Sequence, residues 1–482
     1  MSPTAGRSRL PTSRLTLLAS FAAVSVLNYA FGLAMSWLLA PANFGLLAFA
    51  QTVLLIAGLA LNSGFVQSLA AALVQASPVQ RPALIRGAAI ANMGLALVLG
   101  AVVTLLYALG PLKAGLDTPM VTALIVLTLP PIALKAVACA GAQAAQRFGI
   151  MAALSVVEVV CKVGGGVVLV GAGLGATGAI AGFLVGAVIA ALAGVLVLTR
   201  LYDAAPWGVI ARPALRVAGG MFGALLGMAL LLNLDLMALK LASGPDRATV
   251  GQYQAGSILA NVLFYLVNAL LPILFVQLAR LRRTAETAGP IGEALRLAVL
   301  LVVPVELALA LAPNLALGVF FPHAYAGGAP ALRLLALGNC AVILVAVLSC
   351  AFQATGRAGV PARILLGVTA CEAIVLSVVV PHWHALGAAT VFLGAASCAL
   401  ALLGAAYLRV VGPHVLTLAA PWLGRLGAAL GVGAAAVALV LTQTQGHGAD
   451  SALILGGFCY LACAIALGLL RLPKPKWLVV SG

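Results

Sequence analysis

Apolar stretches of about 20 residues recur along the whole chain, and they constrain its fold more than any other feature. Of its 482 residues only 7% are Asp, Glu, Lys or Arg, whereas soluble globular proteins carry about 25%. A backbone inside a bilayer must satisfy its own hydrogen bonds, so each stretch is expected to be a transmembrane helix. The sequence therefore predicts an all-helical, multi-pass membrane protein and excludes a water-soluble fold.

Short loops with proline, glycine and charge separate the apolar stretches and allow the spans to be placed. About fourteen helices are predicted, at 16–39, 45–75, 87–109, 120–145, 149–172, 174–199, 217–241, 252–279, 293–320, 331–354, 363–381, 385–408, 425–442 and 451–470. The first apolar stretch, 16–39, is longer than the apolar core of a secretory signal peptide, which has about 7 to 15 residues. We therefore interpret it as a first transmembrane helix.

Basic residues alternate between loops, which tests the helix count independently. One side holds 19 of the 26 Lys and Arg residues, among them Arg81, Arg147 and Arg357. The other side holds Lys113 and Arg247, with Arg333 as a further candidate. An even number of helices, with both termini in the cytoplasm, is expected. The formal net charge of +16 then reflects topology, and no nucleic-acid partner is predicted.

The loops between the predicted helices are short, so none of them has room for a soluble catalytic domain or a nucleotide-binding domain. No GxxxxGK[ST], HExxH, GxSxG or CxxC motif occurs, and the eight Cys fall in apolar stretches without partner ligands. We therefore expect a secondary transporter or flippase rather than an enzyme, with no metal and no bound cofactor. Coupling to a proton or a sodium ion stays open.

Two stretches resemble a known family. LLAPANFGLLAFAQ, at residues 38–51, resembles the L-x-P-x-x-F/Y-G turn of the polysaccharide transporters in the multidrug/oligosaccharidyl-lipid/polysaccharide (MOP) exporter superfamily, home of the O-antigen (Wzx-type) flippases. Residues 232–275 resemble the segment that opens this family's second half. There Asn233 and Asp235 end a helix, while Gly251 and Tyr253 match a G-x-Y turn.

The two stretches also indicate an internal repeat, because Gly45 and Gly251 hold equivalent places 206 residues apart. Six helices per half give both halves the same orientation, which is a parallel pseudo-repeat. The predicted segments are an N-terminal lobe at 1–216, a C-terminal lobe at 217–410, and two further helices with a basic cytoplasmic tail at 411–482.

The resemblance implies export of an undecaprenyl-diphosphate-linked oligosaccharide for lipopolysaccharide or exopolysaccharide synthesis. Its partners would be the lipid bilayer, the lipid-linked sugar, and polysaccharide polymerase and assembly proteins. Three alternatives stay open. A drug or cation antiporter of the MATE type would need a dominant acidic cavity, and a lipid II flippase would be needed for cell-wall growth. An enzyme of polysaccharide assembly would retain a large external loop.

Charged residues inside the predicted spans are the functional candidates, because each costs about 2.5 to 3.5 kcal/mol at a helix centre. Lys135 and Glu158 lie 12 residues before and 11 residues after Arg147, so both are expected about 17 Å from that loop and within reach of each other. Lys162 follows Glu158 by one turn in the favoured order for an ion pair. The two lysines are candidates for binding the diphosphate, with Glu158 setting their positions or titrating with a coupling ion. The alternative is a purely structural ion pair that joins the two helices.

The remaining intramembrane charges lie on other predicted helices than Lys135, Glu158 and Lys162. Glu306 and Glu372 lack an obvious basic partner nearby on the same predicted helix, so they are candidates for ion coupling or neutral structural groups. Asp235 and Lys240 are expected near the outer end of their helix in a structural role, with the Lys240 ammonium reaching the interface. Small residues on two helices predict close helix contacts. They are Gly178, Gly182, Gly186 and Gly194, and Gly219, Gly223 and Gly227.

Overall fold

The computed structural model describes residues 12–116, 118–202, 219–242, 247–280, 288–411 and 460. Apart from residue 460, the helices predicted at 425–442 and 451–470 lie outside the described residues. The same holds for the predicted third segment beyond residue 411.

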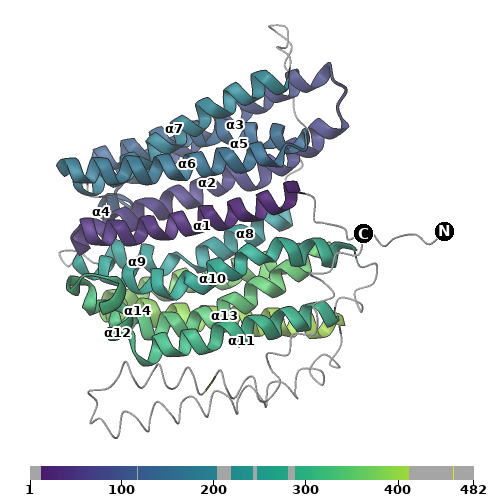
Figure 1. The fold of residues 1–482 in the computed structure, drawn as a ribbon. Helices are drawn as coiled ribbons and strands as arrows, with labels where there is room; N and C mark the ends of the chain where they lie inside the picture. The colour runs from purple at the N-terminus through teal and green to yellow at the C-terminus, as the bar shows by residue number, and fades with distance from the viewer. Residues whose placement is uncertain are drawn as a thin grey trace, which may run out of the picture.

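The described ranges form helices joined by short turns (Figure 1). The helical elements are α1 (Thr12–Leu38), α2 (Pro41–Gln75), α3 (Gln80–Ala108), α4 (Lys113–Leu116), α5 (Pro119–Ala144), α6 (Phe148–Leu169), η1 (Val170–Leu174), α7 (Gly175–Leu201), α8 (Gly219–Leu231), α9 (Leu234–Ala242), α10 (Ala248–Arg280), α11 (Ala288–Leu311), α12 (Pro313–Phe320), η3 (His323–Gly328), α13 (Ala329–Ala354) and α14 (Gly359–Val411). Their bounds agree with the first twelve predicted spans to within several residues.

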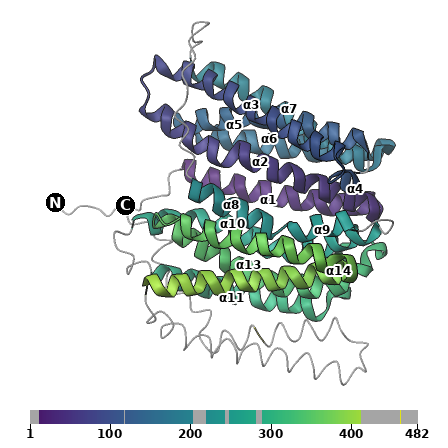
Figure 2. The ribbon, with the colours of Figure 1, turned by 180° about the vertical axis from the view of Figure 1, so that it is seen from behind.

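The helices gather into two groups, α1–α7 and α8–α14, which lie side by side (Figures 1 and 2). The groups converge at the end that holds α4, α9 and α12, here called the α4 end. They spread apart at the opposite end, where the turns carry Arg81, Arg147 and Arg357. We call this second end the arginine-rich end. The predicted alternation of basic loops is thus present in the described turns.

Breaks in the backbone divide the two longest helical runs into separate spans. The 53 residues of α14 would reach about 80 Å, far beyond a bilayer core of about 30 Å. The chain reverses at His384, whose φ is 46°. Residues other than glycine rarely adopt this backbone conformation. Gly173 and Gly175, at φ 90° and 53°, separate α6 from α7 in the same way, and glycine tolerates both values.

Two other predicted spans are less regular than expected. The segment predicted at 217–241 consists of α8 and α9, bent by 45° around Asn233, and the segment at 293–320 breaks into α11 and α12 at Ala312. Over the described residues seven helices are long and apolar enough to cross a membrane, or eight with the bent pair. The chain is therefore a multi-pass membrane protein.

Both predicted glycine ridges lie at close helix contacts. A Cβ on Gly182 of α7 would lie 2.7 Å from the backbone nitrogen of Gly166 in α6. A Cβ on Gly227 of α8 would lie 2.6 Å from the Cβ of Leu365 in α14. Gly219 is an exception, since a Cβ on it would meet no described atom within 4 Å. The other ridge residues bring backbones together, as small residues do in membrane bundles.

Candidate functional site

A cavity of about 560 Å³ separates the two helix groups near the middle of the bundle. Its polar lining comes from both groups: Asn28, Gln51, Thr52, Asn62, Lys135, Glu158 and Lys162 on one side, and Asn233, Gln254, Ser257, Asn261 and Tyr265 on the other. A second cavity of about 1020 Å³ shares Ser25 and Tyr265 with it and extends to Gln146 and Gln353 near the arginine-rich end. The open space therefore continues from mid-bundle toward that end.

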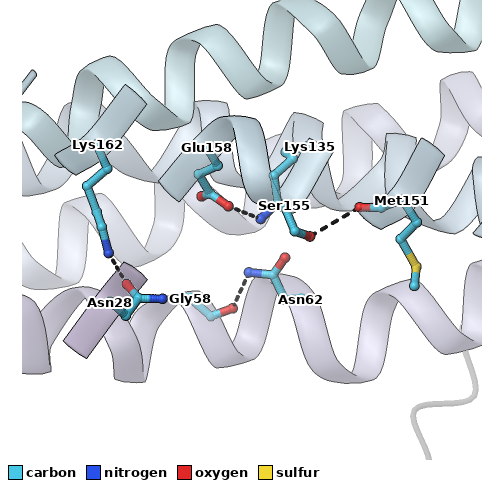
Figure 3. Close-up of polar contacts among 8 residues, drawn as sticks. All are labelled: Asn28, Gly58, Asn62, Lys135, Met151, Ser155, Glu158 and Lys162. Atoms are coloured by element: carbon cyan, nitrogen blue, oxygen red, sulfur yellow. Dashed lines mark hydrogen bonds and ion pairs between the residues drawn. The ribbon is translucent and has the colours of Figure 1, made fainter. Parts of the chain in front are cut away.

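Lys135 and Glu158 form an ion pair in this cavity (Figure 3). The ammonium of Lys135 on α5 donates a hydrogen bond to the Glu158 carboxylate on α6. The two side chains are 12% and 22% exposed, so they are mostly enclosed but not sealed from the cavity. The contact expected from their equal distances to Arg147 is present, and it neutralises Lys135.

Lys162 lies one turn away in a different environment (Figure 3). Its ammonium donates a hydrogen bond to Asn28 Oδ1 on α1 and lies 5.3 Å and 4.8 Å from the ring centres of Phe31 and Phe183. Amide oxygens and aromatic faces stabilise a cation without cancelling its charge. Among the described residues Glu158 makes its hydrogen bond with Lys135 and not with Lys162. The three charged groups therefore leave one positive charge at Lys162.

Glycines of α7 make close contacts with α5 and α6, the helices that carry Lys135, Glu158 and Lys162. A Cβ on Gly186 would lie 2.5 Å from the carbonyl oxygen of Glu158 and 2.9 Å from the Cβ of Lys162. A Cβ on Gly194 would lie 2.7 Å from Ala138, next to Lys135 along α5. The glycine ridge of α7 thus sets how closely α5 and α6, which carry the three charged residues, approach α7.

Asp235 belongs to another cluster, inside the second helix group. Its carboxylate accepts hydrogen bonds from the Tyr253 hydroxyl and from the backbone N–H of Leu236, the latter at 2.8 Å. Lys240 follows on the same helix and is only 2% exposed, so the expectation that its ammonium reaches the interface is wrong. The physical reason is that α9 packs against α2, α10 and α14.

Glu306 on α11 and Glu372 on α14 are buried away from the central cavity. They are 0% and 2% exposed, and within the described chain neither carboxyl group has a hydrogen-bond partner. Neither residue lines the two cavities described above. The structure therefore does not bring these two candidates together with Lys135, Glu158 and Lys162.

The α4 end is closed by contacts between the helix groups. A Cβ on Gly251 would lie 1.9 Å from the carbonyl oxygen of Pro41, so α2 and α10 touch through their backbones. Gly251 lies inside α10 and not in the turn expected from its motif; glycine is required there for close approach. Tyr325 donates a hydrogen bond of 2.8 Å to the carbonyl oxygen of Leu39, and Trp37 donates one of 3.0 Å to Phe320.

Two helix groups that meet at one end and enclose a polar cavity toward the other form the architecture of a membrane transporter. Residues 34–330 match the family described as polysaccharide biosynthesis protein, and the chain belongs to this family. No curated protein matches the chain.

Solved structures show that the fold is that of the MOP superfamily, as the sequence resemblance implied. Lipid II flippase MurJ, in an inward closed conformation, has a TM-score of 0.70 at 13% identity, and the match covers 93% of this chain and 98% of the MurJ chain. An inward-facing multidrug resistance MATE family transporter has a TM-score of 0.56 at 18% identity, over 80% of this chain and 93% of its own. A MOP superfamily transporter from Pyrococcus furiosus has a TM-score of 0.53 at 17% identity, and the match covers 85% of this chain and 98% of that transporter's chain.

Proposed function

We propose that this protein moves sugar units carried on undecaprenyl diphosphate across the bacterial inner membrane for the synthesis of a surface polysaccharide, such as O-antigen or exopolysaccharide. One observation carries the proposal: Lys162 places an uncompensated cation in a cavity between the helix groups, held by Asn28 and two aromatic rings. A diphosphate is the anion that every lipid-linked sugar of this type presents, and a lysine ammonium is a common phosphate ligand.

The lining of the cavity suits an amphipathic substrate. Leu55, Ile132 and Val159 lie beside the polar groups, so apolar and polar surfaces face the same space. Lys135 is already paired with Glu158, and we assign it a structural role in positioning Glu158 and the neighbouring Lys162. This assignment separates the two lysines that the sequence offered together for the diphosphate.

The direction of transport follows from the ends of the bundle. In our proposal the arginine-rich end faces the cytoplasm, together with both termini, because basic loops stay inside. The cavity extends toward that end while Gly251 and Tyr325 close the other, so substrate enters from the inner leaflet. Opening of the α4 end would release it outside, where polymerase and assembly proteins use it.

Glu306 and Glu372 are our candidates for coupling to a proton or a sodium ion. Their buried carboxyl groups lack partners in the described chain, and an ionised carboxylate in such a place is costly. Binding a cation would remove that cost. Asp235 is already bonded to Tyr253 and is assigned a structural role.

The test is a deletion strain of the native bacterium, in which surface polysaccharide is compared with the pool of lipid-linked sugar in the membranes. Loss of surface polymer with accumulation of an intact lipid-linked unit is expected. Plasmids encoding the wild type and Lys113→Met, which changes an exposed lysine at the α4 end, should restore export, whereas Lys162→Met should not. Protein levels are measured by immunoblot.

Other outcomes identify the alternatives. Lysis on depletion, with accumulation of lipid II, would make the protein a lipid II flippase. Unchanged surface polymer and unchanged lipid pools, with a gain in drug sensitivity, would contradict the proposal and favour an antiporter of the MATE type. Normal export by Lys162→Met would remove the diphosphate role of this lysine.

A further inference from the structure

An uncharged polar stripe runs along α10 and faces both cavities. It consists of Gln254, Ser257, Asn261, Tyr265 and Asn268, spaced by three or four residues so that all lie on one helical face. The first four line the central cavity, and Tyr265 and Asn268 line the adjoining one. From Gln254 to Asn268 the stripe is about 21 Å long.

Most hydrogen-bonding capacity of this stripe is unused. Within the described residues its one side-chain bond is donated by Asn261 Nδ2 to Ser257 Oγ, at 3.1 Å, and Asn261 Oδ1 is enclosed without a donor. Polar groups inside a membrane are costly without partners, so a stripe of this length calls for a ligand.

The chemistry of the two walls differs. The wall of the first helix group presents the Lys162 cation, whereas α10 carries no charged residue before Arg280. Amide and hydroxyl side chains both donate and accept hydrogen bonds, which matches the hydroxyl and acetamido groups of a sugar. They are poor partners for a diphosphate compared with an ammonium group.

We propose that the α10 stripe is the sugar-binding wall of the transporter and determines which glycan is accepted, while Lys162 binds the diphosphate common to all such lipids. This inference rests on the proposed function. Asn261 lies at the centre of the stripe and is the principal specificity residue. Tyr265, 47% exposed where the two cavities meet, presents its hydroxyl and its ring to the same ligand.

The experiment measures binding to the full-length protein in nanodiscs. The probes are undecaprenyl diphosphate and the same lipid carrying one N-acetylglucosamine or one galactose. The readout is the ratio of the Kd for the bare lipid to the Kd for each glycolipid. For the wild type we expect a ratio of about ten for the better sugar, since two hydrogen bonds of ordinary strength give a factor of this order.

The variant Gln254→Met, Ser257→Ala, Asn261→Leu removes hydrogen bonds and nearly conserves volume. It should bind the bare lipid within about twofold of the wild type and lower the ratio to about one, the loss expected for those bonds. Lys162→Met should weaken all three probes together. Leu266→Ala, at an exposed position on the same helix outside both cavities, is the matched control and should change neither affinity nor ratio.

Each remaining outcome decides between the two proposals. A wild-type ratio of one for both sugars, or an unchanged ratio in the triple variant, overturns the sugar-binding wall and leaves the flippase proposal standing. Absence of binding of every probe by the wild type overturns both. If the triple variant has a lowered melting temperature, Asn261→Leu alone and Tyr265→Phe alone replace it, and each should lower the ratio about two- to fivefold.

Discussion

Gly45 and Gly251, for which the sequence predicts equivalent places in two halves, cross in backbone contact at the α4 end. A Cβ on Gly45 would lie 2.9 Å from the backbone nitrogen of Gly251. The two glycines stand 206 residues apart in the sequence, and each lies near the start of a long helix. A glycine on α2 and a glycine on α10 therefore supply the two surfaces of the contact that closes this end, and opening must separate these two residues.

Gly251→Ala should prevent this closure. Its Cβ would lie 1.9 Å from the Pro41 carbonyl oxygen, and backbone atoms cannot move aside without separating α2 from α10. Overpacking costs about 1–3 kcal/mol, so the population should shift strongly toward an open α4 end. Spin-label distances between exposed Lys113 and Val319, each replaced by Cys in a cysteine-free background, would report it.

The matched control for that variant is Gly394→Ala. Gly394 also lies in a helix, α14, but nothing lies within 4 Å of its expected Cβ. Its label distances should equal those of the parent protein. An unchanged distance in Gly251→Ala would show that this crossing does not hold the end closed.

Sequence reasoning recovers features that depend on local periodicity and on short hairpins. Lys135 and Glu158 could be paired because both lie nearly the same number of residues from Arg147. The glycines of α7 could be assigned to a helix contact for the same kind of reason, since their spacing puts them on one face. Neither inference needs the arrangement of helices distant in the sequence.

Features that depend on distant helices were missed or wrong. The contact of Lys162 with Asn28 joins residues 134 apart, and helical spacing suggested Glu158 as the partner instead. An amide in the middle of an apolar stretch was the available signal for Asn28. Lys240 was expected at the interface, but the helices around α9 enclose it. The α10 stripe was visible in its spacing, but only the cavities show that it faces α1 and α2.

Lys135→Met should destabilise the protein more than Lys162→Met does. The first change leaves the Glu158 carboxylate largely enclosed without its partner, which costs up to about 3 kcal/mol, whereas the second leaves no acidic group unpaired. Thermal unfolding in detergent measures both variants. Adding Glu158→Gln to Lys135→Met should recover most of the loss, and a double variant as unstable as the single one would contradict a structural role for the pair.

Gly186→Ala should lower stability and ligand affinity together. The new methyl group would meet the Glu158 carbonyl oxygen at 2.5 Å and push α6 from α7, which displaces Lys162. Overpacking of this kind costs about 1–3 kcal/mol. Melting temperature and the Kd for undecaprenyl diphosphate are the measurements. Gly164→Ala, on α6 with nothing within 4 Å, is the control and should leave both unchanged.

Tyr325→Phe should favour opening of the α4 end without unfolding it. The change removes the hydrogen bond of 2.8 Å to the Leu39 carbonyl oxygen but keeps the ring, whose centre lies 5.6 Å from that of Phe44. A hydrogen bond of about 1 kcal/mol corresponds to about a fivefold shift in population. The label distances used for Gly251→Ala would measure that shift. Tyr107→Phe removes a hydroxyl that makes no hydrogen bond among the described residues and should have no effect. An unchanged population in Tyr325→Phe would show that this hydrogen bond does not hold the α4 end closed.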